Sequence, residues 1–454
     1  MLPWYKKAIF YHIYPLGFCG AKKLNDFNLK TMETLEKTYD WIKHIKYLGA
    51  DAIYFGPIFE STSHGYDTVD YNVIDRRLGN NDTFIKLVKT LHKNNIKVVI
   101  DGVFNHVGRD FFAFKDILLK GKKSPYCSWF HRLDFNQNSP LNDPFTYDTW
   151  NGYYNLVKLN LCNSEVKDYL FKAINMWIKD FDIDGLRLDC ADCLDFNFIK
   201  ELASFCKKLK PDFWLMGEII HGDYNRWVNN NMLDSVTNYE CYKGLYSSHN
   251  DKNYFEIAYS LNRQFGKDFG IYKNMYLYNF IDNHDVNRIA STLKFSDYIY
   301  PVYIILFTMP GVPSIYYGSE FGIKGVRNIS DDDLRPELNL KNILSSNYNK
   351  KLIKLIHNLS NIRRGSKALE EGKYIQIKIL NEQFAYARII EGECIIVILN
   401  LSQNFRFMEI NAPIKASKAI DMLNNKDIYK IQNNNCFTIK LEPCWGKILK
   451  LQQQ

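Results

Sequence analysis

Residues 98–106 read Val98-Val99-Ile100-Asp101-Gly102-Val103-Phe104-Asn105-His106, an apolar run that ends in polar side chains. Its β-branched residues favour a buried strand. Three other stretches also carry acidic residues near their ends, and they are Gly185-Leu186-Arg187-Leu188-Asp189, Gly217-Glu218-Ile219 and Ile281-Asp282-Asn283-His284-Asp285. A carboxylate in such a place must be desolvated and then paired. Acidic residues at these positions would not stabilise a sheet that has only a structural role. The pattern therefore indicates a functional site at this edge of the sheet.

Apolar runs of this kind alternate with helical periodicity through about the first 370 residues. Eight of them occur, at Ile9–Phe18, Ala52–Phe59, Val98–Phe104, Gly185–Asp189, Phe213–Ile219, Leu233–Asn238, Tyr276–Ile281 and Pro313–Tyr317. Amphipathic segments such as Thr34–Leu48, Phe84–Asn94 and Val166–Phe181 lie between them, and we expect Ser164 to cap the third. Parallel neighbouring strands need crossover connections. Eight such units predict an α/β fold, the (β/α)8 TIM barrel.

Two other regions depart from this alternation. The connection after the third run, about 105–160, is long and rich in Gly, Pro, Asn and aromatic residues, so we expect an inserted lobe beside the active face. After about Gly372 the runs become short and alternating, at Tyr374–Leu380, Phe384–Ile390, Cys394–Leu401, Cys436–Leu441 and Lys447–Leu451. They predict an all-β sandwich domain. The expected domains are thus 1–371 (catalytic, with the lobe) and 372–454.

Composition excludes several classes of protein. The 454 residues are 46% hydrophobic and 24% charged, as in an ordinary globular protein. No run of about 20 apolar residues occurs, so we expect no membrane span. The net charge of +8 is spread along the chain, which argues against nucleic-acid binding. The first residues lack a signal-peptide pattern, and we expect a cytoplasmic protein.

The ten cysteines are scattered, and free thiols are the expectation for a chain without an export signal. Cys190 and Cys193 are the one close pair. A metal or redox role needs a second pair or a suitable fold context, so we interpret them as two small residues beside a catalytic strand.

The spacing of two acids predicts a reaction. Asp189 and Glu218 are 29 residues apart (218 minus 189), about one βα unit, so they should end adjacent strands. Retaining glycosidases hold two carboxyl groups about 5 Å apart, and neighbouring strands supply about that spacing. Arg187 lies two residues before Asp189 and should point to the same face.

These four stretches resemble the four signature regions of glycoside hydrolase family 13, the α-amylase family. Three more segments resemble its motifs in the expected order, and they are 64–71, 157–160 and 311–320. The resemblance implies that Asp189 is the nucleophile, that Glu218 is the acid/base, and that Asp285 binds sugar hydroxyls. It also implies substrate contacts at Tyr66, Asp67, His106, Arg187, His284, Asp331 and Arg335.

Further roles follow from the same resemblance. Tyr66 should stack on the cleaved sugar, His106 and His284 should bind hydroxyls, and Asp101 should support Arg187 from behind. Each has a plainer alternative, because Asp101 could be structural, the histidines could be core residues and Tyr66 could simply pack. Asp331 and Arg335 resemble a pair that lines an outer subsite.

The nearest likeness is to neopullulanases, cyclomaltodextrinases and maltogenic amylases, through segments such as 124–131 and 181–185. Here the barrel begins within the first residues, so we expect no counterpart of their N-terminal domain. No cofactor is expected to be required, although Asn105 could help to bind Ca²⁺. The acceptor-side residues of those relatives are replaced by Cys190-Ala191-Asp192-Cys193.

Three functions compete. The first is a hydrolase of α-1,4-linked maltooligosaccharides, and the second is a 4-α-glucanotransferase that uses the same residues. The third is a non-catalytic family member, which the presence of all three carboxylates disfavours. The expected partner is an α-glucan oligosaccharide, with no nucleic acid or membrane and no prediction of oligomeric state.

Overall fold

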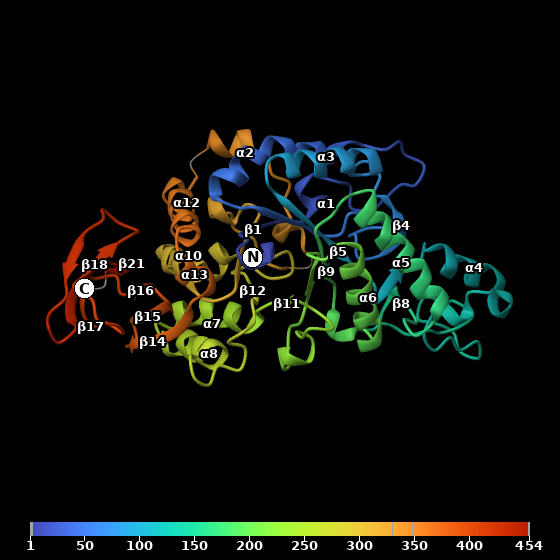
Figure 1. The fold of residues 1–454 in the computed structure, drawn as a ribbon. Helices are drawn as coiled ribbons and strands as arrows, with labels where there is room; N and C mark the ends of the chain where they lie inside the picture. The colour runs from blue at the N-terminus through green and yellow to red at the C-terminus, as the bar shows by residue number, and fades with distance from the viewer. Residues whose placement is uncertain (1–2, 329, 347, 453–454) are drawn as a thin grey trace.

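A closed barrel of eight parallel strands forms the centre of the molecule (Figure 1). The computed structural model describes residues 3–328, 330–346 and 348–452. The strands are β1 (Phe10–Ile13), β2 (Ala52–Phe55), β5 (Lys97–Gly102), β9 (Gly185–Leu188), β10 (Trp214–Gly217), β11 (Ser235–Val236), β12 (Tyr278–Asn279) and β13 (Val312–Tyr316). β13 pairs with β1, and a bridge between Thr237 and Tyr278 closes the ring between β11 and β12. The predicted barrel is confirmed.

Helices surround this barrel (Figure 1). The longer ones are α2 (Thr38–Leu48), α3 (Asn81–Lys93), α5 (Ser164–Lys179), α6 (Phe196–Leu209), α7 (Tyr239–Asn250), α8 (Phe255–Phe265), α10 (Ile299–Thr308) and α12 (Lys350–Arg364). The expected cap at Ser164 was wrong, because the Asn163 side chain already accepts hydrogen bonds from the Glu165 and Val166 amides. In the described part of the chain, none of the helices has the length and apolar character needed to cross a bilayer.

A small lobe follows β5. It contains β6 (His106–Gly108), α4 (Phe112–Lys120), β7 (Thr149–Trp150) and β8 (Tyr153–Lys158). β8 pairs with both β6 and β7, and His106 lies opposite Lys158. Because β6 starts four residues after β5 ends, the lobe is anchored at the carboxyl end of the barrel, where it builds one wall of the site.

The C-terminal region is a sandwich of two antiparallel sheets, at the other end of the molecule from the lobe (Figure 1). The larger sheet contains β14 (Lys373–Ile379), β15 (Gln383–Ile390), β16 (Glu393–Asn400), β21 (Trp445–Gln452), β18 (Lys418–Asp421) and β19 (Ile428–Lys430). β17 (Arg406–Asn411) pairs with β20 (Cys436–Leu441) to form the smaller sheet. Apolar side chains such as Ile396, Met408 and Phe437 are buried between them. The sandwich prediction is confirmed, but the sequence analysis missed β17, β18 and β19.

The sandwich docks on α10, which explains why every residue of that helix is buried. Arg388 donates to the Thr308 and Gly372 carbonyl oxygens, at 2.9 Å for each, and the Tyr386 hydroxyl bonds that of Thr308. Ile304 of α10 also lies against Gly446 of β21. A helix that is apolar on all sides needs a partner on both faces, and here the barrel and the sandwich provide them.

Candidate active site

A cavity of about 1220 Å³ opens at the carboxyl ends of the barrel strands. Seven of the predicted site residues line it, and they are Tyr66, His106, Asp189, Glu218, Asp285, Asp331 and Arg335. Within the described residues, Asp67, Arg187 and His284 are not part of its wall and are at most 5% exposed. The structure therefore places these three behind the site, where they can act only through the residues in front of them.

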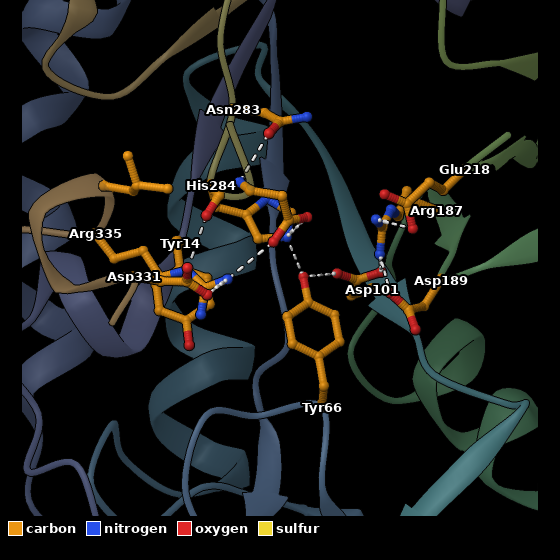
Figure 2. A network of polar contacts seen from close by, with 12 residues as sticks. Tyr14, Tyr66, Asp101, Arg187, Asp189, Glu218, Asn283, His284, Asp331 and Arg335 are labelled. Atoms are coloured by element: carbon orange, nitrogen blue, oxygen red, sulfur yellow. Dashed lines mark hydrogen bonds and ion pairs between the residues drawn. The ribbon is translucent and has the colours of Figure 1, made fainter. Parts of the chain in front are cut away.

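Arg187 joins the carboxylates of three strands (Figure 2). Its Nη1 lies 2.8 Å from Asp101 Oδ1 and 2.8 Å from Asp189 Oδ1, and its Nη2 lies 2.7 Å from Glu218 Oε2. Arg187 is opposite Met216 in the β9–β10 register, so the residues two positions further on, Asp189 and Glu218, leave the sheet at the same level. A planar guanidinium offers donors in a rigid fork, which fixes the two acids relative to each other.

The environment of Glu218 allows its carboxyl group to be protonated near neutral pH. Burial raises its pKa to about 7, although Arg187 opposes the shift, and the charge of Asp189 adds to it. Its Oε2 accepts a hydrogen bond from the Cys190 amide at 3.1 Å, and its Oε1 accepts one from the Tyr239 hydroxyl at 3.3 Å. Cys190 has a φ of 34°, a left-handed conformation that is costly for a residue other than glycine. The backbone therefore adopts a strained turn where it contacts this acid.

Asp285 is held ionised by its neighbours. Burial would raise the pKa of Asp285, but His284 and Arg335 together hold it well below its usual range. His284 Nε2 lies 2.9 Å from Asp285 Oδ2, and Arg335 Nη2 lies 2.9 Å from Asp285 Oδ1. The same Arg335 nitrogen is 2.9 Å from Asp331 Oδ2. The Asp331–Arg335 pair is thus continuous with Asp285, and the Arg335 guanidinium also packs on the Tyr14 ring (Figure 2).

Tyr66 and His284 are stacked, with ring centroids 5.7 Å apart and planes 10° from parallel. The Tyr66 hydroxyl donates to Asp101 Oδ2 at 3.1 Å and also contacts His284 Nε2 (Figure 2). Tyr66 therefore links the carboxylate group around Arg187 to the one around Arg335. Asp67, by contrast, accepts a hydrogen bond from the Ser63 hydroxyl and supports the loop that carries Tyr66.

His106 presents one unused ring nitrogen. Its Nδ1 is 3.2 Å from the Asn105 amide nitrogen, while Nε2 is buried and has no hydrogen-bond partner among the described residues. Burial lowers the pKa of His106, which favours the neutral ring. Since His106 lines the cavity, a ligand hydroxyl is the natural partner for this nitrogen.

Among the described residues, the one group of potential metal-ligating side chains found next to Asn105 is not the oxygen-rich shell that calcium prefers. The single cluster of three or more His, Cys, Asp or Glu ligands found in the described residues is His106, Asp189 and Cys190. It offers one carboxylate oxygen beside a nitrogen and a sulfur, whereas Ca²⁺ takes about six to eight oxygens. Calcium binding by Asn105 stays a prediction, and no step of the reaction is routed through it.

Several residues on the cavity wall were not foreseen. Tyr239 is the first residue of α7 and directly follows a predicted strand. Its position at the end of that strand could have identified it as a residue of the cavity wall. Trp150 and Tyr153 come from the β7–β8 hairpin of the lobe, and their rings stack with centroids 5.8 Å apart. Aromatic enrichment marked that lobe but did not say which rings would face the cavity.

A barrel that presents three acids on strand ends around one cavity is typical of glycoside hydrolases. The family model described as "Alpha amylase, catalytic domain" matches residues 13–352, and the chain belongs to this family of glycoside hydrolases, GH13. It is 32% identical to the maltogenic α-amylase of Bacillus acidopullulyticus, over 96% of this chain and 76% of that protein.

Solved structures agree with this assignment. A cyclomaltodextrinase structure superposes with a TM-score of 0.88 at 26% identity, covering 100% of this chain and 79% of that one. The cyclic α-maltosyl-(1→6)-maltose hydrolase from Arthrobacter globiformis, in complex with maltose, superposes with a TM-score of 0.82 at 25% identity, covering 98% and 99%. The predicted family, and its likeness to maltogenic amylases and cyclomaltodextrinases, are confirmed.

Proposed function

We propose that this glycoside hydrolase cleaves α-1,4-glucosidic bonds of maltooligosaccharides with retention of configuration, with Asp189 as nucleophile and Glu218 as acid/base. One observation carries the proposal. Both carboxylates contact the same Arg187 guanidinium at the end of adjacent strands, and burial raises the pKa of Glu218 to about 7. Two carboxyl groups on neighbouring strands, of which Glu218 has a raised pKa, suit a nucleophile and a proton donor.

In the first step, protonated Glu218 gives its proton to the glycosidic oxygen while an Asp189 oxygen attacks the anomeric carbon. The bond to the leaving sugar breaks, and a covalent glycosyl-enzyme forms. Arg187 positions the nucleophile, because its Nη1 contacts Asp189 Oδ1. Once Asp189 is esterified, its charge no longer raises the pKa of Glu218, so Glu218 stays ionised and is available to accept a proton in the second step.

In the second step, Glu218 takes a proton from water, which attacks the anomeric carbon and releases Asp189. Asp285 is kept ionised by Arg335 and His284, and its oxygens are available to sugar hydroxyls at the cavity wall. The free Nε2 of His106 suits a further hydroxyl. These contacts would strengthen as charge develops on the sugar ring.

The substrate proposal rests on the size of the cavity and on the relatives. A volume of about 1220 Å³ exceeds the roughly 300–1,000 Å³ of a typical small-molecule site, so it suits an oligosaccharide. The names maltogenic α-amylase and cyclomaltodextrinase, and the maltose complex of the Arthrobacter enzyme, point to α-glucans. We propose maltooligosaccharides as the substrate class on these grounds.

Incubation with maltotriose, cyclodextrin, pullulan and soluble starch, with products resolved over time, tests the proposal. Glucose and maltose should accumulate from maltotriose, and the first product should be the α-anomer by proton NMR. Dominance of oligosaccharides longer than maltotriose would assign the 4-α-glucanotransferase reaction instead. A β-anomer as first product would overturn the retaining mechanism, and no cleavage of any glucan would overturn the substrate class.

A further inference from the structure

Two thiols lie directly beside the proposed nucleophile. Asp189 is followed by Cys190-Ala191-Asp192-Cys193, in which residues 191–193 form a short 3-10 turn. Cys190 is buried and Cys193 is exposed, both are free, and both line the cavity. The sequence analysis interpreted them only as two small residues beside a catalytic strand.

The turn brings the two cysteines within disulfide range. The Cys193 amide donates to the Cys190 carbonyl oxygen at 2.8 Å, which closes a four-residue turn. The Cα atoms at the ends of such a turn lie less than about 7 Å apart, and disulfides span Cα separations of about 4.4–6.8 Å. Both side chains also line the same cavity. A bond between them therefore requires only local rotation.

We propose that Cys190 and Cys193 form a reversible disulfide in the wall of the active-site cavity, and that this bond switches the enzyme off. Formation of the bond depends only on the turn. Its effect on glucan cleavage rests on the proposed function.

The chemistry needs a low-molecular-weight disulfide such as oxidised glutathione. The exposed Cys193 thiolate attacks one sulfur of that disulfide, forms a mixed disulfide and expels one small thiolate. Cys190 then loses its proton and attacks Cys193 Sγ, which expels the second small thiolate. Two protein thiols are oxidised by two electrons, and the small disulfide is reduced to two thiols. The neighbouring Cys190 lowers the pKa of the Cys193 thiol, which suits its role as the attacking group.

Oxidation would disturb both catalytic acids at once. The Cys190 thiol donates to Asp189 Oδ2 at 3.3 Å, and a disulfide sulfur has no proton to donate. The Cys190 amide holds Glu218 Oε2 at 3.1 Å, so rotation of the turn moves this donor too. Since misplacement by about 1 Å can cost about a hundredfold in rate, we expect at least a tenfold loss of kcat/KM.

The test is oxidation of the full-length protein with oxidised glutathione, followed by peptide mapping and by activity measurement before and after dithiothreitol. The expected map shows a Cys190–Cys193 link that lacks two hydrogens, with activity at least tenfold lower and restored by dithiothreitol. Cys193→Ser should lose less than twofold on oxidation, relative to its own reduced form. Cys162→Ser, which removes another exposed thiol, should respond like the wild type.

Other outcomes overturn the proposal. A glutathione adduct without the internal link, a link to another cysteine, or a link without loss of activity would each refute the switch. Equal inactivation of Cys193→Ser and wild type would also refute it. If the reduced enzyme cleaves no glucan, the proposed function fails, while the peptide map still decides whether the disulfide forms.

Discussion

Replacement of Glu218 by glutamine should make the stability of the protein rise relative to wild type as pH increases, while abolishing turnover. Burial raises the pKa of Glu218 from 4.5 to about 7, and its side chain is 12% exposed. This difference corresponds to about 3 kcal/mol of preference for the protonated form in the folded protein. Glutamine has the shape of that neutral form, so the variant avoids the cost of burying the ionised carboxylate.

The pH dependence follows from proton linkage. The folded protein binds the Glu218 proton more tightly than the unfolded chain, so this group stabilises the fold fully below about pH 4.5. That contribution falls as pH rises and is lost above the folded pKa of about 7. The glutamine variant lacks this pH-dependent loss of stability. The difference in free energy of unfolding, variant minus wild type, should therefore increase by about 3 kcal/mol between pH 4 and pH 8.

Urea denaturation at pH 4, 5, 6, 7 and 8 measures this difference, and titrations common to both proteins cancel. A constant offset between the two proteins from the lost contact with Arg187 does not matter, because the prediction concerns the change with pH. The exposed Glu409→Gln variant controls for the chemical substitution and should show no such gain. If the free energies of unfolding of Glu218→Gln and wild type change equally with pH, the raised pKa of Glu218 in the folded protein is refuted.

Three further outcomes are expected. Asp189→Asn should lower kcat by more than about 10³-fold with an unchanged unfolding transition, and near wild-type turnover would contradict its role as nucleophile. The kcat/KM of the wild type should decline as pH rises above about 7, because Glu218 must be protonated to act as the acid; a profile flat to pH 9 would contradict this. Arg335→Ala removes the shared partner of Asp285 and Asp331, which are partly exposed, and should cost about 1.5–3 kcal/mol in urea denaturation. A loss below about 0.5 kcal/mol would show that these ion pairs contribute little to stability.

The barrel could be predicted from sequence because each strand carries a local signal. A run such as Trp214–Gly217 is buried on both faces, so it is apolar throughout and stands out from the helices around it. The strands β17 and β19 were missed because half or more of their residues are exposed, and β19 has only three residues. A short strand on a half-exposed sheet has little hydrophobic periodicity to detect.

The sequence by itself determined the barrel, the sandwich and which acidic residues end the barrel strands, since each depends on residue type and on spacing along the chain. Tertiary structure decided how these acids are paired. Arg187 contacts residues from three strands, and Arg335 reaches back 50 positions to Asp285. Tertiary structure also decided which side chains face the cavity. Asp67 and Tyr66 are adjacent in the sequence, but of the two only Tyr66 lines the cavity. The pKa of a carboxyl depends on burial and on charges within a few ångströms, and those distances exist only once the chain has closed into the barrel.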